Sequence, residues 1–123
     1  MAEEWSEHQP IYVQLHDRIV ERILDGDLAE GEALPSVRQV AARLRINPLT
    51  VSRGYQMLVD EGVVEKRRGR GMYVAAGARE TLRARERERF LREEWPAIRA
   101  RMRRLGLDPA LMLEEGEGDD HGR

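Results

Sequence analysis

Residues that could carry covalent or metal chemistry are few in this sequence. It has no cysteine, which excludes disulfides, thiolate nucleophiles and thiolate zinc sites. Its three histidines, His8, His16 and His121, lack the spacing of metal ligands, and no Ser/His/Asp arrangement stands out. The adjacent carboxylates Asp119 and Asp120 are typical of a solvated tail. We therefore expect no enzymatic activity, no metal and no cofactor.

Arginine is the residue type with a clear chemical use here. All but one of the 21 basic residues are arginine, the exception being Lys66. Residues 38–70 hold eight bases against three acids, and residues 77–105 hold ten against five. Acidic residues dominate the two ends, at 1–9 and 106–123. The net charge of −2 is thus an average over a basic middle and acidic ends, and it does not exclude a nucleic-acid partner.

Polar and basic side chains gather at three places in that middle. Guanidinium groups suit phosphates and guanine edges, hydroxyl and amide groups suit either, and a leucine can contact a thymine methyl. Each such residue alone is more often a solvated surface residue, so the expectation rests on their joint placement. The candidate DNA contacts are Ser36, Arg38, Asn47, Leu49, Thr50, Ser52, Arg53, Arg67, Arg68, Gly69 and Arg70.

Two helices must position the first of these residues. An apolar stripe with the helical period follows Pro10 and ends at Gly26, which predicts the first helix. Residues 25–34 are rich in acids and glycine and predict a loop or a short extended segment. Ser36 begins the second helix, because Gln39 three residues later completes a capping box.

A third helix follows after a break of only two residues. Asn47 is a good N-cap, Pro48 suits the first helical position, and the helix is expected to run to Gly62. Two short helices joined by so tight a turn predict a helix-turn-helix. The expected buried face of the third helix consists of Val51, Tyr55, Leu58 and Val59.

A basic hairpin completes this domain. Residues 63–66 and 72–74 are β-prone and flank the glycine-containing basic tip at 67–71. Three helices followed by such a hairpin predict an α+β, mainly α, winged helix-turn-helix over residues 10–76. In that fold the start of the third helix enters the major groove, the start of the second favours a phosphate, and arginines of the wing suit the backbone or the minor groove.

Residues beyond the domain predict a short helical extension. A linker is expected at 75–78, a helical dimerisation segment over 77–115, and an acidic disordered tail at 116–123. Residues 1–9 form an N-terminal arm that could dock on a partner chain. About 45 residues follow the linker, too few to enclose a metabolite pocket, so an effector is left unidentified.

An apolar seam runs along the extension with spacings of 4, 3, 4 and 3 residues. Its members are Leu91, Trp95, Ile98, Met102 and Leu105. We expect it to form a homodimer interface, and the alternative is that it packs on the winged helix of its own chain. Pro96 predicts a kink or a restart of the helix, and Gly106 its end. The arginines of 83–92 alternate with glutamates and predict an ion-paired solvated surface.

Residues 9–76 resemble the N-terminal domain of GntR-type bacterial transcription factors. The resemblance is carried by Leu-Pro-Ser-Val-Arg at 34–38, by Asn-Pro-Leu-Thr-Val at 47–51, and by Gly-Arg-Gly-Met-Tyr-Val at 69–74. The Asn-Pro-x-Thr-Val pattern and the short extension are similar to the YtrA-like branch. The family pattern implies DNA contacts by Arg38 and Thr50.

The chain departs from the family pattern at two positions of the third helix. Many GntR proteins have an arginine where this chain has Pro48, and YtrA-like members often have a polar residue at the position of Leu49. The operator sequence therefore does not follow from the resemblance. We expect a cytoplasmic homodimer that binds double-stranded DNA, has no membrane partner and represses a promoter, which the resemblance suggests is that of a transporter operon. The alternative is a winged-helix protein-interaction module without specific DNA binding.

Overall fold

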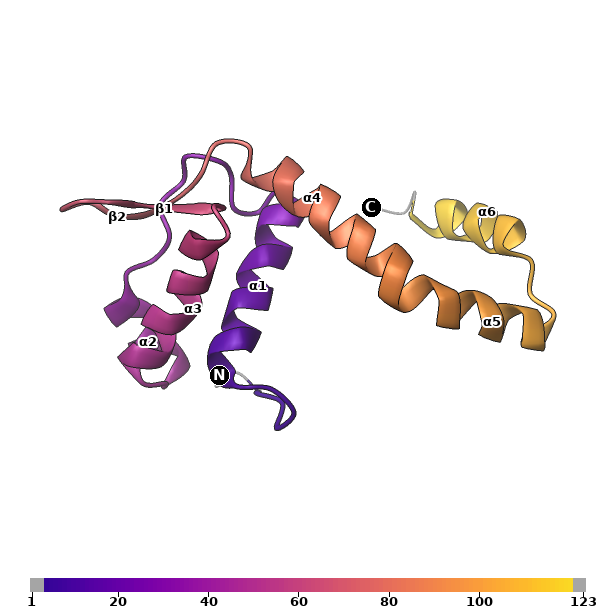
Figure 1. The fold of residues 1–123 in the computed structure, drawn as a ribbon, viewed down its shortest axis with the longest axis horizontal. Helices are drawn as coiled ribbons and strands as arrows, with labels where there is room; N and C mark the ends of the chain where they lie inside the picture. Colours follow the sequence, from indigo (N-terminus) through magenta and orange to yellow (C-terminus); the bar gives the residue numbers. More distant parts are fainter. Residues whose placement is uncertain (1–3, 121–123) are drawn as a thin grey trace. The chain divides into compact units, whose positions relative to one another are not determined.

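The computed structural model describes residues 4–120, with side chains described through residue 114, and forms two compact units. The first unit, Met1–Ala84, is a mainly helical winged helix-turn-helix with a small antiparallel sheet (Figure 1). The second unit, Arg85–Arg123, is helical. The elements of the first unit are α1 (Ile11–Asp25), α2 (Val37–Leu44), α3 (Pro48–Asp60), β1 (Val64–Arg67), β2 (Gly71–Val74) and the start of α4 (Ala78–Arg89).

Local capping signals set the ends of α1 and α2. The Ser36 hydroxyl accepts a hydrogen bond from the Gln39 N–H at 3.1 Å, and the Gln39 side chain accepts one from the Ser36 N–H at 3.0 Å. The predicted capping box is therefore confirmed. Gly26 ends α1 in the left-handed conformation at φ +87°, as expected. Pro10 is the N-cap residue of α1 rather than its first helical residue, because its ψ of 147° is extended.

The predicted start of α3 is also confirmed. The Asn47 side-chain oxygen accepts a hydrogen bond from the Leu49 N–H at 2.8 Å, and Pro48 occupies the first turn. Arg45 takes the left-handed conformation between α2 and α3, at φ 57°. This residue reverses the chain without a glycine, so the break between the two helices stays as short as the sequence predicts.

The core of the first unit lies where α3 packs against α1. Val51, Tyr55 and Leu58 of α3 are buried, whereas Val59 is only partly buried. The α1 side chains of this core are Leu15, Ile19, Val20 and Ile23. Gly54 is buried in the same contact, and a Cβ atom there would lie 3.0 Å from the Tyr12 backbone oxygen. Its missing side chain therefore lets the two helices approach closely.

The wing is an antiparallel pair of β1 and β2, in which Val64 pairs with Val74 and Arg67 with Gly71. The segment 31–34 runs along the free edge of β2. The Gly31 N–H bonds the Val74 oxygen at 2.8 Å, and the Leu34 N–H bonds the Met72 oxygen at 2.8 Å. The last part of the stretch at 25–34, which was expected to be a loop or an extended segment, is therefore extended. It connects the wing to the start of α2.

The expected linker at 75–78 is not a free connection. Ala75 and Ala78 are buried, and so is Leu82 one turn into α4. The Arg79 guanidinium donates to the Leu24 carbonyl at 3.0 Å. The spacing of three and four residues gives α4 one apolar face, and this face docks its first turns on the first unit. The compact unit therefore reaches Ala84.

The second unit continues as a short π-helical segment (Phe90–Glu94), α5 (Trp95–Leu105) and α6 (Pro109–Asp120). The π segment ends two residues before Pro96, whose ring and missing N–H disturb the hydrogen bonding of the preceding turn, so the expected interruption is confirmed. Gly106 ends α5 at φ +72°. The Asp108 side chain caps α6 by accepting from the Ala110 N–H at 3.0 Å.

The acidic disordered tail expected at 116–123 stays a prediction. From its capped start, α6 is helical through Asp120. Residues 121–123 lie outside the described residues. Among the helices that the structure describes, none has the length and apolar character to cross a membrane.

Gly54→Ala should test the close approach of α3 and α1. Alanine has the higher helix propensity by about 1 kcal/mol, but the added methyl group would meet a backbone oxygen that cannot yield alone. We expect the free energy of unfolding in urea to fall by about 1 kcal/mol. Ser52→Ala is the control, since this exposed position of the same helix should gain or keep stability. An unchanged or higher stability of Gly54→Ala would contradict the contact.

His16 should give the fold a measurable pH dependence. Its Nε2 lies 2.7 Å from a Glu61 oxygen at the end of α3, and its Nδ1 lies 2.8 Å from an Asp17 oxygen. Burial lowers the pKa of His16, but the hydrogen bonds to Glu61 and Asp17 raise it more, so the pKa exceeds the ordinary 6.5.

A raised pKa means that the folded state binds the proton more tightly than the unfolded state. The resulting stability is fully present below pH 6.5 and is lost as the pH rises through the folded-state pKa. We expect the stability advantage of the wild type over His16→Gln to shrink over that range in urea unfolding. His8→Gln, at an exposed position, is the control. An NMR titration that places the His16 pKa at or below 6.5 would contradict the stabilising contacts of His16 with Glu61 and Asp17.

Candidate nucleic-acid interface

A groove of about 490 Å³ lies between the start of α2, the exposed side of α3 and the wing. Its polar lining comes from all three elements, and two glycines of the wing border it. The polar and basic residues of this groove are Ser36, Ser52, Gln56, Lys66, Arg67 and Arg70. The fold therefore brings together side chains that lie as far apart as 34 residues in the sequence.

The start of α2 offers Arg38 and free backbone N–H groups. The Ser36 hydroxyl is engaged in the capping box, so its contribution is to fix the helix start. Arg38 is exposed in the first turn and makes no ion pair within the described residues. A helix N-terminus carries a partial positive charge, and the guanidinium adds a full one. This end of α2 is thus suited to a phosphate.

The start of α3 presents a mixed set of side chains. Asn47 uses its side-chain oxygen for the helix cap, Leu49 is 75% exposed, and Thr50 is half-buried. Ser52 is exposed and lines the groove. An exposed leucine at the start of a helix of this kind can contact a thymine methyl group, and Thr50 and Ser52 can donate to a base or a phosphate.

Arg53 lies apart from the groove. Its guanidinium stacks over the Tyr12 ring of α1, 4.2 Å from the ring centre. Such a contact stabilises an exposed arginine by about 0.5–1 kcal/mol, which is small enough for a phosphate to displace it. The role of Arg53 in DNA contact therefore stays a prediction, and its resting position is on α1.

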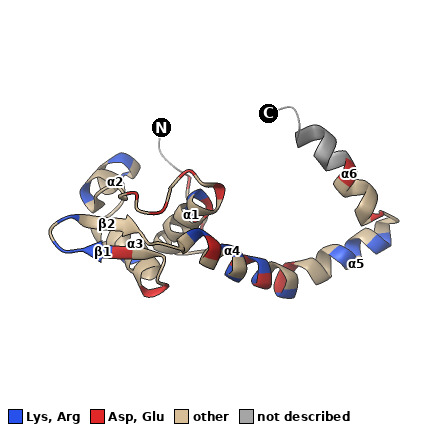
Figure 2. Ribbon diagram, turned by 90° about the horizontal axis from the view of Figure 1, so that it is seen from above, with Lys and Arg blue, Asp and Glu red and all other residues tan. Residues whose placement is uncertain are grey.

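The wing carries three arginines around a glycine turn. Arg67 stacks over the Tyr73 ring at 4.2 Å and lies 3.5 Å from a Glu65 oxygen. Arg68 and Arg70 are exposed. Gly69 takes φ +74°, a conformation that favours glycine at this turn. Figure 2 shows basic residues along the loop between β1 and β2 and on α2.

Sequence reasoning missed Gln56 and Lys66, both of which line the groove. Gln56 follows Ser52 by four residues on the same face of α3, and its amide donates to Asp60 at 2.9 Å. The helical spacing from Ser52 could have indicated it. Lys66 lies within the predicted strand, where its orientation depends on the register of β1 with β2.

Tyr55 fixes the geometry of the two helices behind this groove. Its hydroxyl donates to the Pro35 carbonyl at 2.6 Å, which ties α3 to the residue before the α2 cap. Burial raises the pKa of Tyr55 to about 12, although the charges of Arg43 and Arg22 oppose this rise. The phenol is therefore a neutral hydrogen-bond donor at physiological pH.

Comparisons with known proteins agree with this geometry. Residues 11–74 match the family described as bacterial regulatory proteins, gntR family. The chain is 34% identical to the uncharacterized HTH-type transcriptional regulator YhcF of Bacillus subtilis over 114 residues, which is 93% of each protein. The chain belongs to the GntR family. It is a DNA-binding transcriptional regulator of this family, and its relatives YhcF and YtrA are named as transcriptional regulators rather than enzymes.

Two further GntR relatives are similar to this chain. The HTH-type transcriptional repressor YtrA of Bacillus subtilis is 44% identical over 73 residues, covering 59% of this chain and 56% of YtrA. The crystal structure of a putative GntR-family regulator from Bacteroides thetaiotaomicron is 32% identical, with a TM-score of 0.67. It covers 92% of this chain and 99% of that one. The GntR fold expected from the sequence, including the likeness to YtrA, is thus confirmed.

Arg38→Ala and Lys66→Ala should each weaken DNA binding in a salt-dependent way. A lost phosphate contact lowers affinity for all sequences and reduces the slope of log K against log salt concentration by about one. Fluorescence anisotropy with a labelled duplex, measured over several salt concentrations, gives both values. Arg83→Ala is a charge-matched control at an exposed position of α4. A slope that equals the wild-type value would remove the residue from the interface.

Proposed function

We propose that this GntR protein is a homodimeric repressor that occupies a pseudo-palindromic operator. The observation that carries the proposal is the groove in which α2, α3 and the wing gather their polar side chains. A major-groove reader needs one helix face packed and the other free, and α3 has buried Val51 and Leu58 opposite exposed Ser52 and Leu49. The regulator would act in the cytoplasm, where bacterial DNA lies.

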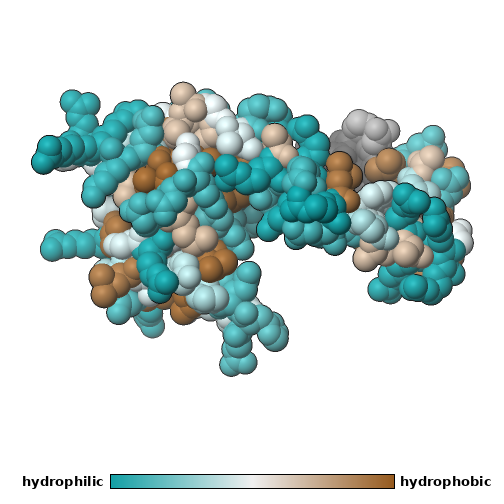
Figure 3. Space-filling model, in the orientation of Figure 1, coloured by the Kyte–Doolittle hydropathy of each residue, from teal (hydrophilic) through white to brown (hydrophobic). Residues whose placement is uncertain are grey.

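The dimer proposal is supported by an apolar face on the second unit. Leu91 is 53% exposed, Ile98 41% and Leu105 59%, while Trp95 and Met102 are half-buried. Figure 3 shows apolar surface on this unit beside hydrophilic side chains. Large apolar side chains exposed along one seam are typical of an interaction surface.

Residues next to the seam enlarge the same kind of surface. The Phe90 and Trp95 rings lie 6.5 Å apart, and α6 adds Leu111 and Leu113, which are exposed. A second copy of the chain would match this surface with an identical one, as a two-fold interface requires. Such a dimer would present two α3 helices to two half-sites of one operator.

Two arginines of the extension, Arg89 and Arg92, support a solvated role rather than a second DNA site. Arg89 pairs with Glu86 at 2.7 Å, and Arg92 pairs with both Glu88 and Glu93. Charges that are already paired along the helix surface have less to gain from a phosphate. We therefore assign DNA binding to the first unit and dimer formation to the second.

Repression is supported by the relatives. YtrA of Bacillus subtilis is named as a repressor, and the likeness to YtrA covers 59% of this chain. A regulator with a DNA-reading domain and a short dimerisation segment can repress simply by occupying a promoter. We propose that its target is a transporter operon next to its own gene, as the resemblance to the YtrA-like branch suggests.

Binding to the DNA upstream of its own gene tests the regulatory role. We expect a nanomolar complex at physiological salt, typical of specific regulators, and a footprint with two related half-sites. The double variant Arg67→Ala/Arg68→Ala should lose at least tenfold in affinity. If this variant and Arg38→Ala both bind DNA with wild-type affinity, the result would favour the alternative function. In that alternative, the winged helix is a protein-interaction module whose α3 contacts a protein partner.

Ile98→Asp should test the dimer. A charge in the centre of the seam would be desolvated without a partner, so we expect monomers at micromolar concentration in sedimentation equilibrium. Ala97→Asp places the same charge on the neighbouring exposed position, outside the seam, and should remain dimeric. A wild-type protein that sediments as a monomer would overturn the dimer. DNA binding by the monomer would then still be tested by the footprinting experiment described above.

A further inference from the structure

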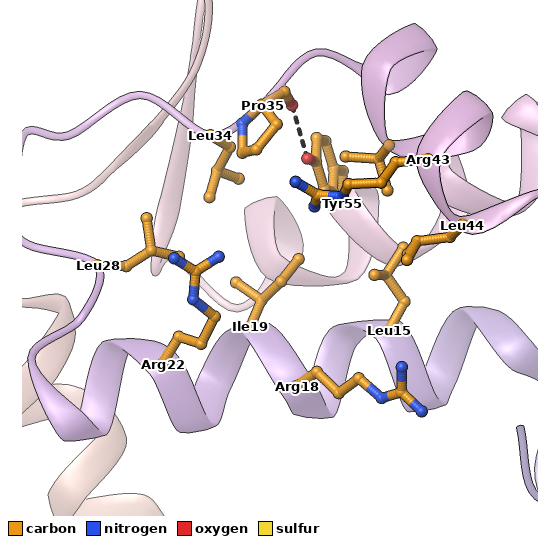
Figure 4. A pocket seen from close by; sticks show the side chains of 11 residues that line it. Leu15, Arg18, Ile19, Arg22, Leu28, Leu34, Pro35, Arg43, Leu44 and Tyr55 are labelled. Atoms are coloured by element: carbon orange, nitrogen blue, oxygen red, sulfur yellow. Dashed lines mark hydrogen bonds between the residues drawn. The ribbon is translucent and has the colours of Figure 1, made fainter. Parts of the chain in front are cut away.

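A second cavity of the first unit lies away from the groove described above. It has a volume of about 190 Å³ and is bordered by α1, the segment 28–35 and α2, with Tyr55 of α3 at its inner end (Figure 4). Its floor is apolar and consists of buried side chains. These are Leu15, Ile19, Leu28, Leu34 and Val40.

Arginines form the rim of this apolar cavity. Arg18 is already engaged, since it donates to the Glu4 carbonyl at 2.7 Å and stacks over the Trp5 ring at 4.0 Å. The guanidinium groups of Arg22 and Arg43 are exposed and make no hydrogen bond or ion pair within the described residues. Figure 4 shows both groups extending over the apolar floor, one from α1 and one from α2.

The Tyr55 hydroxyl adds a polar group at the inner end. It donates to the Pro35 carbonyl at 2.6 Å and keeps its oxygen lone pairs. The charges of Arg22 and Arg43 both act on this hydroxyl. The two cationic groups therefore face the same small space from opposite helices.

We propose that this cavity binds a small organic anion with an apolar body, of the class of short aliphatic or aromatic carboxylates. The carboxylate would accept hydrogen bonds from Arg22 and Arg43, and the hydrocarbon part would contact Leu28 and Leu34. A guanidinium and a carboxylate have opposite charges, and both are planar, so they can form two parallel hydrogen bonds. Inorganic phosphate would satisfy the arginines but leave the apolar floor unfilled, and a neutral alcohol would do the reverse.

The size of the cavity limits the ligand. Pockets for drug-sized molecules have volumes of about 300–1,000 Å³, so this one suits a molecule of the size of hexanoate or benzoate. The first unit provides this smaller pocket between helices that its core holds in place.

The position of the cavity gives the ligand a route to the DNA interface. Leu34 and Pro35 line both the cavity and the groove. Pro35 directly precedes the Ser36 cap of α2 and accepts the Tyr55 hydrogen bond from α3. A carboxylate that competes for the Tyr55 donor would act on both helices that reach DNA. This regulatory part rests on the proposed function, whereas ligand binding does not.

NMR titration of the full chain with sodium hexanoate tests the site. We expect saturable shifts of the amide signals of Leu28, Leu34 and Tyr55. Binding of 1-hexanol and of inorganic phosphate should each be at least tenfold weaker, because each supplies half of the recognised chemistry. Equal shifts with hexanoate and 1-hexanol, or shifts that do not saturate, would overturn the proposal.

Arginine variants make the test specific to this cavity. Arg22→Gln/Arg43→Gln should weaken hexanoate binding at least tenfold, while Arg83→Gln, an exposed arginine of α4, should bind as the wild type does. Because both variants change exposed positions, we expect them to fold, and thermal unfolding checks this. Unchanged hexanoate affinity in the double variant would refute the site.

DNA affinity in the presence of saturating hexanoate separates this proposal from the proposed function. A change of at least threefold in the wild type, absent in Arg22→Gln/Arg43→Gln, would support the regulatory coupling. Hexanoate binding without such a change would overturn the coupling and keep the site. Hexanoate binding by a protein that fails to bind DNA would overturn the proposed function and keep the site as well.

Discussion

The close contact of α3 with α1 is the constraint on which the rest of the structure depends. A helix that reads DNA must be held rigidly by one face so that the other is free, and Val51 and Leu58 are completely buried on the held face. Gly54 brings the Tyr12 carbonyl within 3.0 Å of the place where a Cβ would lie, so α3 cannot slide without moving α1. The charge-assisted contact of His16 with Glu61 joins α1 to the C-terminal end of α3 as well.

Features encoded by neighbouring residues were predictable, and features that join distant segments were not. The capping box at Ser36, the Asn47 cap and the stop at Gly106 are signals of three or four residues, and each was confirmed. The stacking of Arg53 on Tyr12 joins residues 41 positions apart. The docking of Ala78 likewise depends on surfaces that exist only once the fold has formed. The candidate contacts were therefore predicted from the placement of their residue types on expected elements, while the groove that gathers some of them needed the structure.

Charge illustrates the same distinction between local and folded information. The net charge of −2 conceals a basic middle. In the folded chain, some arginines form ion pairs and others do not. Arg89 and Arg92 are paired with glutamates along their own helix. Arg70 instead lines the groove, and Arg38 is exposed in the first turn of α2; neither has such a pair in the described chain. The local field that a phosphate meets is set by these unpaired groups.

One short segment connects all parts of the DNA-reading unit. Residues 31–34 bond the edge of β2, Pro35 accepts the hydrogen bond of Tyr55, and Ser36 caps α2. The wing, α3 and α2 are thus fastened to six consecutive residues. A displacement of this segment must change the spacing of all three elements, since each holds it through a different bond. A change in this one segment would therefore alter the geometry of the groove that the three elements line.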